Sequence, residues 1–220
     1  SPAVPSVTEV KGRFTNLKSY VYFKYNDLNQ IFFPTRGLKI NTELAQVYNQ
    51  RPNLRLFENG TPVIPSNLNF ENFSRFTLDA SLFTPLNKKF NFLAELQAGI
   101  NFTNQPNYLN NFLIGGLNGS FRNQVRFAGL QEATLNSSSV LALQLGLRYN
   151  PASNIYITGR INGLVKNFAT RNNITSAKDG LSGYALTFAY KTPIGPIELS
   201  AMYSDQSKKL QSYIMLGIPF

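Results

Sequence analysis

The chain has 220 residues, of which 43% are hydrophobic and only 15% are charged, and its net charge is +10. Charged residues make up about 25% of an ordinary soluble protein, so this composition suits a large water-exposed surface poorly. No stretch approaches the roughly 20 consecutive apolar residues that a membrane-spanning helix requires. Few charges, 13% aromatic residues and no long apolar run together favour a β-rich membrane protein.

The residue types that the chain lacks exclude several classes of function. The chain has no cysteine and no histidine, so it has no disulfide, no Ser-His or Cys-His catalysis and no imidazole metal ligand. The nearest approach to a G-x-S-x-G nucleophile motif is G-L-S-G at Gly180–Gly183, which lacks the spacing. We therefore expect neither enzyme activity nor a cofactor. The 21 basic residues are scattered rather than clustered, so we also expect no nucleic-acid partner.

The first part of the chain predicts two strands and a long loop. Residues 1–16 contain prolines and lack the charged and apolar regions of a signal peptide, so we expect a lead-in segment of a mature, processed or shortened protein. Period-two alternation predicts a strand over Leu17–Tyr25 and, after a turn closed by Pro34, another that begins at Gly37. The polar, Asn- and Pro-rich segment Gln50–Phe73 is predicted to be a loop.

Seven further strands follow by the same alternation, which brings the count to about nine. They cover Ser74–Thr84, Phe90–Asn101, Val140–Tyr149, Ile155–Lys166, Tyr184–Tyr190, Ile197–Tyr203 and Ser212–Phe220. The segment Phe112–Leu130 is a candidate for a tenth strand.

Alternation alone fits two fold classes, a soluble β-sandwich whose apolar faces form a core and a membrane barrel whose apolar face meets lipid. Three features favour the barrel. Short turns alternate with long polar loops. Many strands reach the roughly 9–11 residues that cross a bilayer at a tilt. Tyrosines recur near strand ends, where an aromatic girdle would lie, at Tyr149, Tyr184, Tyr190 and Tyr203. The predicted fold is therefore an all-β, antiparallel transmembrane β-barrel domain over residues 17–220, or the C-terminal part of one.

The polar faces of these strands carry charges of both signs, which would point into the barrel. They form either a lumen network along a hydrated channel or ion pairs that stiffen the wall, because buried charges need partners. These residues are Lys39, Glu43, Arg75, Asp79, Glu95, Arg148, Arg160 and Glu198.

Several motifs resemble those of one family. The segment F-F-P-T-R-G-L from Phe32 resembles the strand entry of the BamA-like outer-membrane assembly and translocation barrels, also called the bacterial surface antigen family. Gly115-Gly116 is similar to the glycine pair before that family's in-folded loop, and five predicted strands follow it, as in the family. The chain end resembles the family's C-terminal insertion signal, here made of Ile214, Leu216, Ile218 and Phe220.

The resemblance implies a functional loop. The family's in-folded loop carries Val-Arg-Gly followed by an aromatic residue, and its arginine reaches an aspartate on the barrel wall. Here Val125, Arg126 and Phe127 match in part without the glycine, and Arg122 is a second candidate. Asn162 occupies the position of the aspartate and would make a weaker, uncharged acceptor. The alternative is that both arginines are solvated loop charges.

The resemblance also implies a function and partners. Barrels of the family have 16 strands, so the resemblance implies that this chain is the C-terminal portion of one. Such a barrel lies in the lipid of the bacterial outer membrane and is inserted there by the barrel assembly machinery. Its expected function is protein insertion or translocation. The stretch from Gly183 to Ser200 is most similar to barrels that follow patatin-like phospholipase domains. A passive pore or membrane anchor for an upstream patatin-like lipase is therefore one alternative, with periplasmic domains also possible upstream. A soluble β-sandwich binding module is the other.

Overall fold

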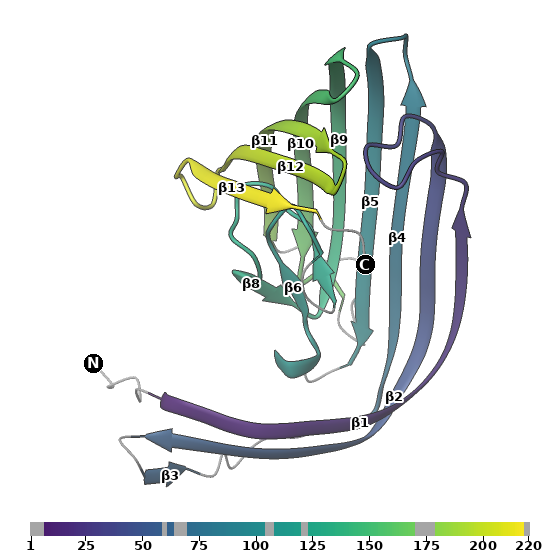
Figure 1. Ribbon diagram of the computed structural model, residues 1–220. Coiled ribbons are helices and arrows are strands. Elements are labelled where there is room, and N and C mark those ends of the chain that lie inside the picture. Colours follow the sequence, from purple (N-terminus) through teal and green to yellow (C-terminus); the bar gives the residue numbers. More distant parts are fainter. Residues whose placement is uncertain are drawn as a thin grey trace.

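One antiparallel sheet dominates the computed structural model, which describes residues 7–58, 61–63, 70–103, 108–119, 123–169 and 179–217 (Figure 1). Its nine main strands follow chain order, which confirms the predicted all-β fold and the predicted number of strands. The strands are β1 (Val7–Asn26), β2 (Gly37–Glu58), β4 (Phe73–Pro85), β5 (Phe90–Phe102), β9 (Ser139–Ala152), β10 (Ile155–Lys166), β11 (Asp179–Thr192), β12 (Gly195–Ser204) and β13 (Gln211–Leu216). A short strand, β3 (Thr61–Val63), pairs with the end of β2.

We call the large sheet the wall. A second, smaller sheet lies on one face of it. It consists of β6 (Phe112–Ile114), β7 (Gln124–Val125) and β8 (Leu135–Ser137). Figure 1 shows β6 and β8 on the side enclosed by the curl of the large sheet. The prediction that residues 112–130 form a tenth wall strand is therefore wrong, because this segment is broken into pieces of two or three residues by a pair of glycines and a turn. Within the described ranges, the 3-10 turn η1 (Tyr108–Asn110) is the sole helix, and none is long enough to span a membrane.

The register separates the two faces of the wall. Residues directly opposite one another in an antiparallel pair share a face, and the pairings Asn41↔Asp79, Asp79↔Gln97 and Gln97↔Ala142 trace the inner face from β2 to β9. The outer face exposes large apolar side chains on successive strands, including Val21, Leu44, Leu82, Leu143, Ile161, Phe188, Leu199 and Ile214. All eight charges predicted to face the lumen lie on the inner face.

This arrangement excludes the soluble sandwich. A sandwich covers the apolar face of each sheet with the other sheet. Here the small sheet packs on Val140, Leu164 and Leu181 of the inner face, which also carries the charged residues, while the described outer face leaves its apolar side chains exposed. That is the pattern of a membrane barrel wall.

Two strands are longer than predicted. β1 begins at Val7 rather than Leu17, and β2 continues to Glu58, so part of the lead-in and part of the predicted loop are strand. The register shifts between Thr15 and Leu17, and Asn49 has a φ of 50°. Two residues of β1 face three of β2 there, so the extra residue moves the alternation of β2 to the other face and interrupts its period-two signal in the sequence. Figure 1 shows the far parts of β1 and β2 bending away from the wall.

The sheet is open between its first and last strands. In the described residues β1 pairs with β2 and β13 pairs with β12, and no pairing joins β1 to β13. Ile214 and Leu216 of the predicted insertion signal lie on the exposed outer face of β13. Ile218 and Phe220 lie outside the described residues.

Candidate functional site

The segment between β5 and β9 folds back along the inner face of the wall, and we call residues 112–137 the in-folded loop. Gly115 and Gly116 have φ values of 129° and 77°, which side-chain-bearing residues rarely adopt. The Gly116 N–H donates to Leu130 O at 3.0 Å, and Gly116 O accepts from the Phe127 N–H at 2.9 Å. The backbone of Gly116 therefore joins the two limbs of the loop through these hydrogen bonds.

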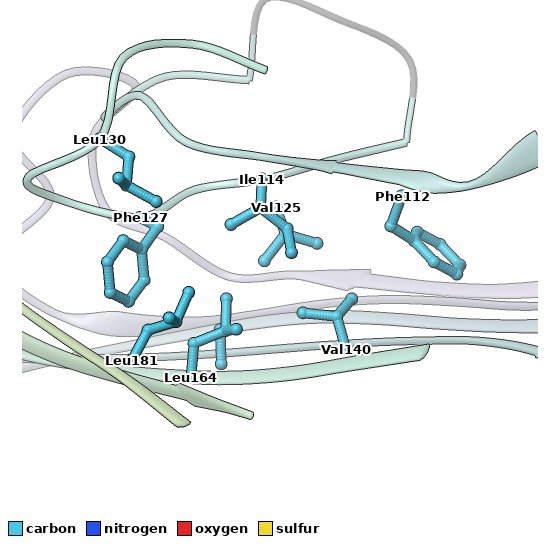
Figure 2. Packing of buried hydrophobic residues seen from close by; sticks show 9 residues of the cluster. Phe112, Ile114, Val125, Phe127, Leu130, Val140, Leu164 and Leu181 are labelled. Atoms are coloured by element: carbon cyan, nitrogen blue, oxygen red, sulfur yellow. The ribbon is translucent and has the colours of Figure 1, made fainter. Parts of the chain in front are cut away.

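An apolar cluster anchors the loop to the wall (Figure 2). Its loop side consists of Phe112, Ile114, Val125, Phe127 and Leu130, and its wall side of Val140, Ala142, Leu164 and Leu181. Phe127 and Ile114 are completely buried. Each such side chain contributes about 1.5–3 kcal/mol when it is removed from water. The loop is therefore held mainly by burial, and its polar contacts select where it lies.

Arg126 joins the loop to two wall strands. Its Nη2 lies 3.0 Å from Asp79 Oδ1 on β4 and 3.1 Å from Glu95 Oε2 on β5. Its backbone N–H donates to Gln97 Oε1 at 2.8 Å. Burial disfavours the guanidinium charge, but the carboxylates of Glu95 and Asp79 outweigh that penalty, and the pKa of Arg126 is raised. One cation thus holds together two anions that would otherwise repel each other.

The prediction that Arg126 pairs with Asn162 on the wall is wrong, because Arg126 pairs with Asp79 and Glu95. Asn162 instead accepts a hydrogen bond from the Ala128 N–H, at 3.1 Å from its Oδ1. The loop runs across the wall strands, so Arg126 lies over β4 and β5 while Ala128, two residues on, lies over β10. Asp79 and Glu95 were predicted as lumen charges, but nothing in the sequence linked them to Arg126. Arg122, the other candidate, lies outside the described residues.

Beyond Ala128 the loop reaches the last strands. A side chain at Gly183 of β11 would collide with Ala128 O, so the loop backbone packs directly on the wall there. Ser204 Oγ of β12 donates to Gly129 O at 2.9 Å. Tyr213 Oη of β13 donates to Glu132 Oε1 at 2.7 Å. No local sequence signal pointed to these contacts, which join residues far apart in the chain.

The F-F-P-T-R-G-L segment packs on the wall at the other end of the strands. Phe33, with a φ of 51°, stacks on Tyr156 with 4.1 Å between ring centroids. Arg148 Nη1 donates to Pro34 O at 2.9 Å, and its guanidinium lies over the rings of Phe33, Phe83 and Tyr156. The β1–β2 connection is thereby drawn inward onto β9 and β10, and Arg148 acts as its anchor.

The other predicted lumen charges each have their own hydrogen-bond or ion-pair partners or lie near one another on the inner face. Arg75 donates to Asn101 Oδ1 at 2.7 Å and to the Asn110 carbonyl. Arg160 donates to Thr187 Oγ1 at 2.8 Å, and Glu43 pairs with Lys18 at 2.8 Å. Lys39 and Glu198 lie on the same face, on β2 and β12, and Glu198 is within electrostatic reach of Arg160 and Arg148. The described residues hold no group of three or more potential metal ligands.

The curled wall, its apolar outer face and the in-folded loop define the class of this protein as a transmembrane β-barrel or part of one. The chain matches the profile of the OMP85 superfamily over residues 8–220, and it belongs to that superfamily. Members of the superfamily are outer-membrane proteins. The resemblance to BamA-like barrels is thus confirmed at the level of the family. A search of curated proteins finds no match to the chain.

Proposed function

We propose that the chain is the membrane-embedded part of a bacterial outer-membrane barrel that inserts proteins into the membrane or translocates them across it. The observation that carries the proposal is the in-folded loop, which is attached to β4 and β5 by Arg126 and to β13 by Tyr213. β13 has an edge without a strand partner among the described residues. Such an edge presents backbone groups that can pair with an incoming strand.

In this proposal the loop supports the terminal strand from inside while its free edge meets a client strand. The charges on the inner face stiffen the wall, because Arg126 of the loop pairs with Asp79 and Glu95 and the loop backbone donates to Asn162. Outer-membrane lipid surrounds the barrel, and the barrel assembly machinery inserts it. The barrel domain, predicted over residues 17–220, is proposed to include β1 from Val7. The chain itself carries out no catalysis and requires no cofactor.

The experiment is client folding by the full-length protein in lipid vesicles. An unfolded outer-membrane barrel is added, and its folded fraction is followed by heat-modifiable gel migration. We expect faster client folding than in empty vesicles, and slower folding with Arg126→Met. The control Lys18→Met removes another inner-face cation, which pairs with Glu43 of the wall instead of joining the loop to it. Equal client folding with and without the protein would contradict the proposal.

The second candidate is a passive pore or anchor for an upstream patatin-like lipase domain. It rests on the likeness of the β11–β12 hairpin region to barrels of that type. A steady ion conductance in planar bilayers that is unaffected by Arg126→Met, without client folding, would favour it. Any lipase activity would then reside in a separate domain.

A further inference from the structure

The outer face of the wall has a groove over β9, β10 and β11. It has a volume of about 780 Å³. Its walls are the outward apolar side chains Leu141, Leu143, Leu145, Ile161, Val165 and Tyr184. Leu143, Ile161 and Tyr184 remain about half exposed, so the groove opens toward the surroundings of the barrel rather than toward the lumen.

Two outward-facing glycines make the groove hollow. Gly163 of β10 lies between Leu143 of β9 and Ser182 of β11 in the register, and Gly180 of β11 lies opposite Val165. A Cβ added at either glycine would meet no atom within 4 Å. The same strand has a third outward glycine, Gly159, with equally open space, but it does not line the groove. The hollow therefore depends on residues 163 and 180.

One end of the groove is polar. Ser182, Asp205 and Gln206 form its rim, and Ser182 Oγ donates to a carboxylate oxygen of Asp205. The turn that begins at Asp205 also carries Lys208 and Lys209, which are both exposed. This turn lies on the side of the long connections, which face the exterior in outer-membrane barrels. The site thus combines an apolar trough with a positively charged turn at one end.

We propose that the groove holds one acyl chain of a membrane lipid whose phosphate-bearing headgroup lies at the Lys208–Lys209 turn. The apolar walls match a hydrocarbon chain, and the two ammonium groups complement a phosphate. Filling the hollow with a chain restores the contacts that an empty groove would lose. The inference rests on the proposed membrane location, because lipid acyl chains surround the outer face of the wall only in a membrane.

The test uses the full-length protein in vesicles of phosphatidylethanolamine and phosphatidylglycerol with a minor fraction of phosphatidylglycerol that carries a diazirine on one acyl chain. After illumination, adducts are mapped by mass spectrometry. We expect adducts several-fold denser on Leu141, Leu143 and Tyr184 than on Leu186 and Leu199, which are outward apolar residues outside the groove. Gly163→Leu should lower groove labelling to the level of the surrounding belt, and Gly159→Leu should leave it unchanged. Lys208→Gln with Lys209→Gln should lower it in part.

The possible results distinguish a failure of the lipid site from a failure of the proposed membrane location. Even labelling along the apolar belt, or groove labelling unaffected by Gly163→Leu, would overturn the lipid site and leave the membrane barrel intact. Protein–protein adducts in place of lipid adducts at the groove would overturn the lipid as occupant. No labelling anywhere would overturn the membrane location and the site with it. Gly180→Val fills the groove from the next strand and provides a second variant if Gly163→Leu does not fold, with folding checked by heat-modifiable migration.

Discussion

Tyr213 Oη donates to Glu132 Oε1 at 2.7 Å, and this contact ties the last described strand to the in-folded loop. Tyr213 Oη also accepts a hydrogen bond from Asn118 Nδ2 at 3.3 Å. The same loop is bound to β4 and β5 through Arg126. The strand at one open edge of the sheet is therefore linked to the middle of the wall through the loop, as well as through its neighbour β12.

The first prediction concerns this link. Tyr213→Phe removes the hydrogen bond to the Glu132 carboxylate, and because the pair is only partly buried we expect β13 to lose about 1 kcal/mol of local stability. Amide hydrogen exchange in β13 should become faster, while exchange in β4 and β5 should not change. Tyr203→Phe, on the outward face of β12, is the control. Equal β13 exchange rates in the two variants would show that the hydroxyl does not hold the strand.

The second prediction concerns Arg126. Arg126→Met leaves Asp79 and Glu95 without their shared cation. Removing one partner of a fully buried ion pair costs about 3–5 kcal/mol, and we expect about 1–3 kcal/mol here because Asp79 is 37% exposed. The measurement is the temperature at which heat-modifiable migration is lost.

A charge rescue distinguishes electrostatics from lost packing. Adding Asp79→Asn and Glu95→Gln to Arg126→Met removes the stranded carboxylates, and we expect much of the lost stability to return. Lys18→Met, which removes a cation that pairs with one wall carboxylate only, should have a smaller effect. A triple variant no more stable than Arg126→Met would assign the loss to packing of the arginine stem.

Much of the wall follows from alternation in the sequence. The period of two assigned all eight charged residues to one face, and the register agrees, because a strand's two faces differ only by parity. The starts and ends were less predictable: an extra residue in β2 beside Asn49 breaks the parity of that strand, so β2 was predicted to give way to a loop at Gln50 although it continues to Glu58. The open edge of β13 follows from no local pattern.

The wall residues that the loop contacts could not be predicted from the sequence, for a different reason. Asp79 and Glu95 lie on the two arms of one predicted hairpin, so their nearness was accessible, but the position of Arg126 over them depends on how the whole loop packs. The family motif pointed to Asn162, which the loop does contact, through the backbone of Ala128. Strands of two or three residues, such as β7, have no periodic signal at all.

The third prediction concerns the close approach of loop and wall. Gly183→Ala would place its Cβ against Ala128 O, a backbone atom that moves only if the loop does. We expect a loss of about 1–3 kcal/mol, as for overpacking elsewhere, together with faster protease cleavage in the in-folded loop. Gly159→Ala, on the neighbouring strand with open space at its Cβ, should leave cleavage unchanged. Similar cleavage in both variants would show that the loop does not depend on this contact.

The fourth prediction concerns the anchor at the other end of the wall. Arg148→Lys keeps the positive charge but loses the planar guanidinium that lies over Phe33 and Tyr156 while donating to Pro34 O. Cation–π contacts of a desolvated arginine are worth about 2 kcal/mol, so we expect the β1–β2 connection to loosen by about that amount. The measurement is hydrogen exchange in the connection together with the melting temperature from heat-modifiable migration. Arg36→Lys changes an exposed arginine of the same motif and should have little effect. If Arg148→Lys behaves like Arg36→Lys, a point charge at position 148 is sufficient, and the stacked geometry is not what holds the connection inward.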